Sequence, residues 1–286
     1  MSDTNDVREK SHWGWGWADR FPTAEQRRER GQQAKMLLGF APERVDEPVP
    51  LSAVTLPAPR VQPPAALAAI SDTTVGARVR HTHGRNFPDI LRGFRGDFAG
   101  APDVVAFPND EADVTRVLDW ASAADVVVVP YGGGTSVVGG ISAGGEQPFV
   151  SLDLSRLDRL LEVDTVSRSA RIQAGASGPR LEAQLAEHDL TLRFFPQSFE
   201  FATLGGWIAT RAGGHFAMGP THIDDLVEST RTVTPRGVLE TRRLPGSGAG
   251  PSADRLILGS EGTLGVITEA WMRVRPKPTQ RSTATC

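Results

Sequence analysis

Three consecutive glycines that follow a β-branched segment are the feature that most constrains how this chain can fold. Residues 126–129 read VVVV, and residues 130–140 continue directly as PYGGGTSVVGG. Glycine allows positive φ angles and lets the backbone come close to a ligand or to another segment. Successive bare N–H groups can also form a concave nest for an anion. We therefore expect a buried strand that ends in a tight loop, with some other group very close to its backbone.

Two common phosphate-binding loops do not fit these residues. A Walker loop needs Gly-Lys followed by Ser or Thr, and the only lysines are Lys10, Lys35 and Lys277. A Rossmann fingerprint needs glycine where Val137 stands and a helix after it, but SVVGGISAGGEQP is too rich in glycine and β-branched residues for a helix. What remains is a strand, a nest and a second strand, holding a diphosphate by backbone N–H groups without a helix dipole or a cation. A tight turn without a ligand is the alternative.

Two further segments support a ligand, because they have the same glycine-punctuated, small-residue character. They are PQSFEFATLGGWIATRAGG at residues 196–214 and LILGSEGTLGVITEA at residues 256–270. Three such segments together indicate a long ligand threaded between them.

The order of predicted elements indicates an α+β fold with an N-terminal arm. Residues 1–80 form the arm: an aromatic strap (HWGWGWADRF), a helix over residues 23–40, and a connector over residues 41–66 with seven prolines. We expect the strap to pack on the main body, with ligand stacking as the alternative. The main domain covers residues 81–277, in lobes of about 101–190 and 191–277, and residues 278–286 form a disordered tail.

Within the main domain, local patterns predict individual elements. Asn109 is expected to cap a helix whose apolar face includes Val114, Val117, Leu118 and Ala121. Strands are expected at 126–130 and 149–155, and a hairpin at 160–164 and 169–176. A helix should open at Pro179. A second hairpin should turn at residues 235–237, and a short helix and a final strand should end at Pro276.

Composition excludes several classes of protein. The net charge is −3 and no basic block stands out, so nucleic-acid binding is not expected. The single cysteine, Cys286, rules out an intramolecular disulfide and a thiolate metal cluster. The polar start lacks the apolar core of a signal peptide, and no run is long enough to cross a bilayer. We expect a cytoplasmic protein.

Five segments in order carry a resemblance to a known family: PYGGGTSV, SFEFATLGGWIATRAGG, IDDLV, VTPRGVLE and GSEGTLGVITEA. Together they resemble the FAD-binding domain of the vanillyl-alcohol oxidase type, also called PCMH-type. The sequences of these segments are most similar to those of the alkylglycerone-phosphate synthases. These ether-lipid flavoenzymes are also named alkyldihydroxyacetonephosphate synthases. The resemblance covers roughly residues 80–277, and the aromatic strap also matches.

The resemblance implies a set of FAD-contacting positions. The first segment would wrap the diphosphate, the second would line the flavin and ribityl region, and the third would contact the adenine side and close the site. The positions are Pro130, Tyr131, Gly132, Gly133, Gly134, Thr135, Ser136, Gln197, Ser198, Phe199, Glu200, Phe201, Ala202, Thr203, Thr210, Arg211, Ala212, Gly213, Glu261, Gly262, Thr263, Leu264, Gly265, Val266 and Ile267. Hydroxyls on Ser198, Thr203, Thr210 and Thr263 could serve ribityl or phosphate oxygens. Arg211 could neutralise a phosphate or the reduced flavin, with a solvated arginine as the alternative.

Some positions depart from the family pattern. Gln197 stands where Asp is common, Phe194 and Phe195 where charged or His residues are common, and Pro220–Thr221 where Tyr-Gly is usual. These changes concern the substrate rather than FAD. Some relatives attach FAD through a histidine in the glycine loop, and Thr135 and its neighbours offer none, so we expect non-covalent FAD.

The family implies an exchange of acyl for alkyl on glycerone phosphate, without net redox change. Its cap and its catalytic tail would follow residue 277, so we expect a truncated product, a split protein whose cap comes from a separate chain, or a bare flavin module. The catalytic residues are unknown, since Tyr131 is the only tyrosine and lies in the cofactor loop. An FAD-linked oxidoreductase of 2-hydroxy acids or alcohols and a catalytically silent FAD-binding subunit stay open. The substrate is a small molecule or a lipid.

Other polar residues favour less specific roles. His81 and His83 lack a third metal ligand nearby, so we expect loop packing and no metal site. His215 and His222 follow the TRAGG motif and could approach the flavin, although hydrogen bonding is the default expectation. Asp224 and Asp225 are expected to be solvated, or to cap a turn, before the strand LVEST.

Overall fold

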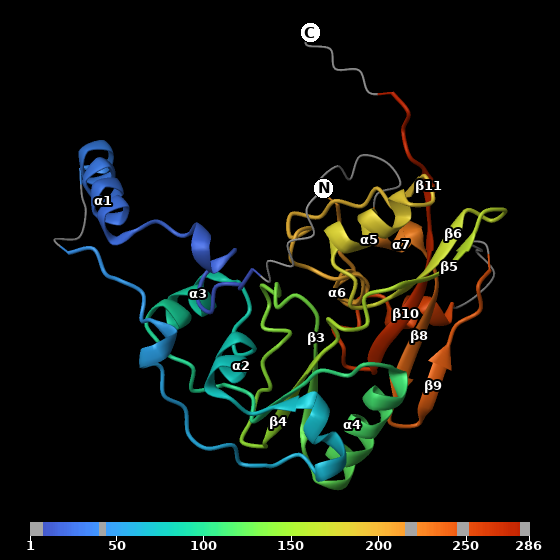
Figure 1. Cartoon of the computed structure of the whole chain (residues 1–286), viewed down its shortest axis with the longest axis horizontal. Helices are drawn as coiled ribbons and strands as arrows, with labels where there is room; N and C mark the ends of the chain where they lie inside the picture. The colour runs from blue at the N-terminus through green and yellow to red at the C-terminus, as the bar shows by residue number, and fades with distance from the viewer. Residues whose placement is uncertain (1–7, 40–43, 215–221, 245–251, 281–286) are drawn as a thin grey trace.

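The computed structural model describes residues 8–39, 44–214, 222–244 and 252–280. Two β-sheets, each accompanied by its own helices, pack side by side, and helix α1 (Ala24–Leu38) lies at the edge of the molecule (Figure 1). His215, Pro220, Thr221 and residues 281–286 of the predicted tail lie outside the described residues. The mixture of helices and sheets confirms the predicted α+β class.

The first sheet has the strand order β1-β2-β4-β3. Strand β4 pairs in parallel with both β2 and β3, and the short β1 runs antiparallel to β2. All five residues of β4 are buried, as a strand in the middle of a covered parallel sheet requires. The elements around this sheet are η1 (Ala18–Arg20), η2 (Leu51–Ala53), η3 (Ala65–Ile70), β1 (Ser71–Asp72), α2 (Val75–Arg80), α3 (Phe87–Phe94), β2 (Val104–Ala106), α4 (Glu111–Ala123), β3 (Val127–Tyr131) and β4 (Phe149–Asp153).

The second sheet is antiparallel throughout, with the order β5-β6-β10-β8-β9. Its helices cover an apolar core in which Phe194, Leu204 and Trp207 are almost fully buried. The elements are β5 (Leu160–Asp164), β6 (Ser169–Gln173), α5 (Gly178–Ala186), β7 (Leu190–Thr191), α6 (Leu204–Ala209), α7 (Ile223–Leu226), β8 (Val227–Thr234), β9 (Gly237–Glu240), α8 (Ala253–Ile257), β10 (Val266–Arg273) and β11 (Arg275–Pro276). Strands β7 and β11 form a separate two-stranded ribbon.

The division between the sheets differs from the predicted lobes, which met at about residue 190. Strands β5 and β6 precede that point but belong to the second sheet. The reason is the pairing of β6 with β10, which runs in register from Glu269 opposite Gln173 to Arg273 opposite Ser169. The chain therefore crosses from one sheet to the other between Asp153 and Leu160.

The residues that cap the helices can be compared with the local sequence patterns that predict them, and one prediction is wrong by a single residue. Thr23 and Gln26 form a capping box for α1, and Gly39 ends that helix with a φ of 70°. The N-cap of α4 is Asp110 rather than the predicted Asn109, because the Asp110 carboxylate accepts a hydrogen bond from the N–H of Asp113. Asn109 instead donates to the carboxylate of Asp113.

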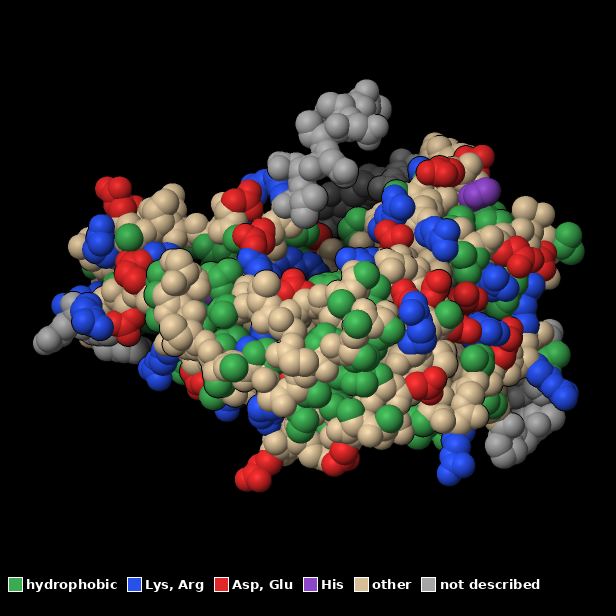
Figure 2. All heavy atoms as spheres, turned by 60° about the horizontal axis from the view of Figure 1, so that its bottom comes forward, with side chains coloured by type: hydrophobic (Ala, Val, Ile, Leu, Met, Phe, Trp, Pro, Cys, Tyr) green, Lys and Arg blue, Asp and Glu red, His purple; other side chains and the backbone are tan. Residues whose placement is uncertain are grey.

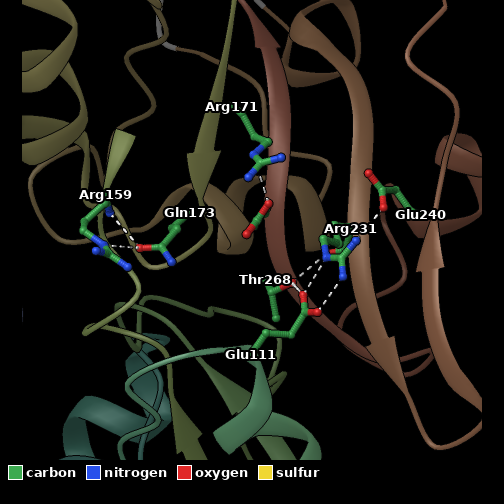
Figure 3. Close-up of polar contacts among 8 residues, drawn as sticks. Glu111, Arg159, Arg171, Gln173, Arg231, Glu240 and Thr268 are labelled. Atoms are coloured by element: carbon green, nitrogen blue, oxygen red, sulfur yellow. Dashed lines mark hydrogen bonds and ion pairs between the residues drawn. The ribbon is translucent and has the colours of Figure 1, made fainter. Parts of the chain in front are cut away.

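A polar cluster joins the two sheets (Figure 3). Glu111, the first residue of α4, accepts hydrogen bonds from Arg231 of β8 and from the hydroxyl of Thr268 in β10. Arg231 also contacts Glu240 of β9, and neighbouring Arg171 pairs with Glu269. The hydrogen bonds from Arg231 lower the pKa of Glu111 from its usual value, whereas burial raises the pKa of Glu269.

The surface seen in Figure 2 carries charges of both signs interspersed with apolar side chains. No single-sign patch covers that face. Among the described residues, no helix is both long and apolar enough to cross a bilayer.

Candidate cofactor site

A cavity of about 330 Å³ opens where three glycine-rich segments meet. The first segment follows β3 of the first sheet, whereas the second and third flank α6 and β10 of the second sheet. Its lining residues are Pro130, Tyr131, Gly132, Gly133, Gly134, Thr135, Ser136, Val137, Val138, Gly140, Ile141, Leu154, Ser198, Ala202, Thr203, Gly205, Gly206, Trp207, Ala209, Thr210, Ala212, Glu261, Gly262, Gly265 and Ile267. The site therefore lies between the two sheets.

The glycine loop, residues 132–148, connects β3 to the parallel strand β4 without a helix. Parallel strands usually need a helical crossover, so this irregular connection is unusual. Among the residues that the structure describes, no acceptor faces the backbone N–H groups of Gly132 to Val137. Because a backbone N–H needs a hydrogen-bond partner, this row of amides is suited to an anion. The predicted arrangement of strand, nest and strand is present.

The close neighbours of the three glycines are groups of the protein itself. A Cβ on Gly132 would overlap the hydroxyl of Thr203, and one on Gly133 would overlap the carbonyl oxygen of Phe201. Gly134 has a φ of 67°, and a Cβ there would overlap the hydroxyl of Tyr131. The absence of side chains thus lets the loop pack tightly against the second segment.

The second segment is shaped by a turn and a short helix. Thr203 caps α6, and the N–H groups of Leu204 and Gly205 donate to the carbonyls of Ala176 and Ala174. A Cβ on Gly205 would lie 2.8 Å from the methyl group of Ala174. Glycine at this position therefore lets α6 sit directly on the strand end of β6.

The third segment is tied to the end of α6 by backbone bonds. The N–H of Gly259 donates to Ile208, and the N–H of Glu261 donates to Ala209. Glu261 and Gly262 both have left-handed backbone angles, with φ of 52° and 77°. This turn places Glu261 and Gly262 beside Pro130 and the glycine loop.

The structure brings most, but not all, of the predicted site residues to the cavity. All of Pro130–Ser136 line it, as do Ser198, Ala202, Thr203, Thr210, Ala212, Glu261, Gly262, Gly265 and Ile267. Other predicted positions do not line it: Gln197, Phe199, Glu200, Phe201, Arg211, Gly213, Thr263, Leu264 and Val266. Phe199 packs against Trp207, and Val266 is buried between the sheets. Thr263 donates to Ser260, and Glu200 accepts from Trp17 of the strap.

Asp224 differs from its expected role, and Arg211, whose side chain is largely exposed, is one of its partners. The Arg211 guanidinium lies 2.6 Å from the Asp224 carboxylate, and Arg255 lies 2.8 Å from the same oxygen. Asp224 is therefore a buried ion-pair acceptor rather than a solvated residue, because two arginines from neighbouring segments enclose it. Its neighbour Asp225 is exposed, as expected.

The described histidines His81, His83 and His222 have polar partners within the protein. His81 is buried and contacts the carboxylate of Asp153 at 2.9 Å and the carbonyl of Ala77. His83 bonds to the carbonyl of Asp97, and His222 lies 3.3 Å from the Asp224 carboxylate. Among the described residues, no three groups of metal-ligating type gather in one place.

Sequence reasoning missed nine lining residues: Val137, Val138, Gly140, Ile141, Leu154, Gly205, Gly206, Trp207 and Ala209. Most lie inside the glycine-rich segments or directly beside them. Treating each whole segment as cavity lining would therefore have predicted them. Leu154 could not be predicted as a lining residue, because it lies outside the glycine-rich segments. In the folded protein its N–H donates to the carbonyl of Tyr131, which also lines the cavity.

Tyr131 and Glu261 are the titratable side chains among the described residues that line the cavity. Burial raises the pKa of Tyr131 well above its usual value, so its hydroxyl stays protonated and donates to the carbonyl of Arg80. Tyr131 is thus a structural hydrogen-bond donor here.

Comparison with known proteins agrees with this geometry. Residues 102–242 match the family model described as FAD binding domain. An alkyldihydroxyacetonephosphate synthase from Dictyostelium discoideum is 44% identical over 203 residues, which is 71% of this chain and 33% of that protein. The mitochondrial cytochrome-type D-lactate dehydrogenase of Arabidopsis thaliana is 37% identical over 65% of this chain and 32% of its own.

Solved structures show the same relationship. A structure of alkyldihydroxyacetonephosphate synthase, 34% identical, superimposes with a TM-score of 0.84 and covers 95% of this chain and 55% of its own. The chain spans about a third of the length of the curated relatives that it matches. It therefore contains a PCMH-type FAD-binding domain related to that of the alkyldihydroxyacetonephosphate synthases.

Proposed function

We propose that the cavity between the two sheets holds FAD non-covalently, with the diphosphate on the backbone amides of Gly132–Ser136. The observation that carries this proposal is the row of amides without acceptors among the described residues, at the meeting point of three glycine-rich segments. Hydrogen bonds to a charged group contribute on the order of 1.5–3 kcal/mol each, so a few amides suffice to anchor a diphosphate.

The lining side chains fit the rest of a flavin dinucleotide. Ser198, Thr203 and Thr210 bring hydroxyl groups to the cavity for ribityl oxygens, and Ile141 and Trp207 supply apolar surface for rings. The described lining contains no histidine, which supports non-covalent attachment. When bound, the flavin would supply the electrophilic or redox-active ring, and this chain would orient it and exclude water.

For the whole protein, we propose the exchange of an acyl for an alkyl group on glycerone phosphate. The support is the identity to the synthase of Dictyostelium discoideum and the match to a synthase structure over nearly the entire chain. Glu261 and Tyr131 are the described titratable groups at the cavity, and Tyr131 is held as a structural donor. The substrate-binding and acid–base groups would therefore come from a cap outside the flavin site, on further residues or on a separate chain.

A second candidate is an FAD-linked oxidoreductase of 2-hydroxy acids. The identity to a D-lactate dehydrogenase over most of the flavin domain favours it, because both groups of enzymes share this domain. A flavin domain that only binds FAD is the outcome if neither activity is present.

The purified chain tests these proposals in two stages. We expect a yellow protein, or one that takes up added FAD, whose flavin is released by acid precipitation. A chain that neither carries nor binds FAD would contradict the cofactor proposal. With FAD bound and the cap supplied, by a longer form of the protein or by the separate chain, turnover of acyl-glycerone phosphate and a fatty alcohol supports the synthase activity. Flavin bleaching by D-lactate or D-2-hydroxyglutarate under the same conditions supports the oxidoreductase.

A further inference from the structure

A second, small cavity adjoins the glycine loop, and two cationic side chains border it. Lys10 and Arg85 line this cavity together with Gly133 and Thr135, and its volume is about 10 Å³. Gly133 and Thr135 also line the main cavity. The same short stretch of backbone therefore lies next to the proposed diphosphate position and next to two cations.

Lys10 lies at the loop because residues 8–21, which are the aromatic strap and the four residues before it, are held in place by several contacts. Residues 8–21 are called the N-terminal strap below. Lys10 and Trp17 form an antiparallel bridge within the strap. The indole N–H of Trp17 donates to Glu200 at 2.7 Å, and its ring lies 5.2 Å from the ring of Phe201. Since the Phe201 carbonyl is the group against which Gly133 packs, the strap and the glycine loop share one support.

Arg85 is joined to the loop directly. Its backbone N–H donates to the carbonyl of Ser136 at 2.7 Å. Its guanidinium donates to three neutral acceptors, the carbonyls of Ser11, His83 and Gly84. None of these bonds neutralises the positive charge of Arg85.

The carboxylates nearby lie closer to other partners, although the charge of Asp153 acts on Lys10 and that of Asp89 acts on Arg85. Asp153 contacts His81, Asp89 contacts Arg92, and Glu9 contacts Arg80. Among the described residues, no carboxylate forms an ion pair with Lys10 or Arg85. Burial lowers the pKa of both side chains, and the nearby charges of Asp153 and Asp89 offset only part of this effect. A bound anion would therefore stabilise the two cations further.

We propose that Lys10 and Arg85 form a cationic side of the diphosphate site, so that the N-terminal strap is part of the cofactor site. This proposal rests on the proposed binding of FAD. The two side chains would add positive charge to a loop that otherwise offers only backbone N–H groups to the diphosphate. The ligand group is the diphosphate of a dinucleotide, which carries negative charge on both phosphates. Lys10 and Arg85 come from outside the three glycine-rich segments, 123 and 48 residues before Gly133 by their numbers.

The main test is Lys10→Met in the full chain, because no hydrogen bond of the Lys10 side chain among the described residues is lost with it. FAD and riboflavin affinities are measured by flavin fluorescence titration at several salt concentrations. We expect FAD to bind about tenfold more weakly, with a flatter salt dependence, while riboflavin binding keeps its wild-type value. Lys35→Met is the matched control, since Lys35 is exposed on α1, and it should change neither affinity.

Arg85→Lys gives a second measurement, because it keeps the charge and removes the guanidinium bonds. We expect it to retain FAD much better than Arg85→Met. The proposal is wrong if Lys10→Met binds FAD like the wild type with the same salt dependence, or if it weakens FAD and riboflavin equally. A wild-type chain that binds no FAD would instead refute the proposed function.

Discussion

Glu111 accepts hydrogen bonds from two nitrogens of Arg231, each at 2.8 Å, although 120 residues separate them in the sequence. Glu111 begins α4 beside the first sheet, and Arg231 lies in β8 of the second sheet (Figure 3). Thr268 of β10 donates to the same carboxylate. This contact therefore joins the two sheets whose segments form the cofactor cavity.

Replacing Glu111 with alanine should destabilise the protein. The change removes the charged acceptor of Arg231 and Thr268, so we expect the free energy of unfolding to fall by about 1–3 kcal/mol. Urea unfolding followed by tryptophan fluorescence measures it. Glu146→Ala, at an exposed loop position, should stay within about 0.5 kcal/mol of the wild type. Equal losses in both variants would argue against a contact between the sheets.

The same carboxylate predicts a pH dependence. Its pKa is lowered in the folded protein by the hydrogen bonds from Arg231, so its contribution to stability is complete above the unfolded value of about 4.3. It is lost as pH falls through the lower folded value. The difference in unfolding free energy between wild type and Glu111→Gln should therefore shrink below about pH 4. A difference that stays constant down to pH 3 would show that the carboxylate charge is not involved.

Gly133→Ala should weaken FAD binding, because the glycine loop packs tightly against the protein's own second segment. The new Cβ would overlap the carbonyl of Phe201 and push the glycine loop away from the second segment. We expect FAD affinity to fall at least about tenfold. The free energy of unfolding should fall by roughly 1–3 kcal/mol, as is usual when an extra group is forced into a packed region. Gly144→Ala is the control, because nothing lies near its Cβ position and its φ is not positive. The interpretation would not survive if the two variants behaved alike.

Asp224 and Asp225 offer a matched pair of adjacent acids. Asp224→Asn removes the charge that holds Arg211 and Arg255, and should lower the free energy of unfolding by about 1–3 kcal/mol. Because Thr210 and Ala212 flank Arg211 and line the cavity, FAD affinity should fall with it. Asp225→Asn, at an exposed position, should change both within experimental error. Denaturant titrations of the two variants measure the free energy of unfolding, and flavin fluorescence titrations measure their FAD affinity.

Elements made by neighbouring residues could be predicted well. The hairpin of β8 and β9 turns where Pro235, Arg236 and Gly237 predict it, and α5 begins beside Pro179. The cap of α4 was predicted one residue early, since Asn109 and Asp110 are both good capping residues. The sheet boundary was placed too late, because the pairing of β6 with β10 joins residues about a hundred positions apart and leaves no local signal.

Local sequence is enough to predict the strand, the glycine loop and the second strand, and with them a row of backbone amides suited to a diphosphate. Glycine and β-branched residues influence the backbone at their own positions, so the loop and the strands can be predicted from the order of the residues. The neighbours of those glycines, the Phe201 carbonyl and the Thr203 hydroxyl, became known from the packed structure, as did the small cavity that Lys10 shares with Gly133. These contacts depend on how the two sheets and the distant N-terminal arm pack together, and packing is a property of the whole chain.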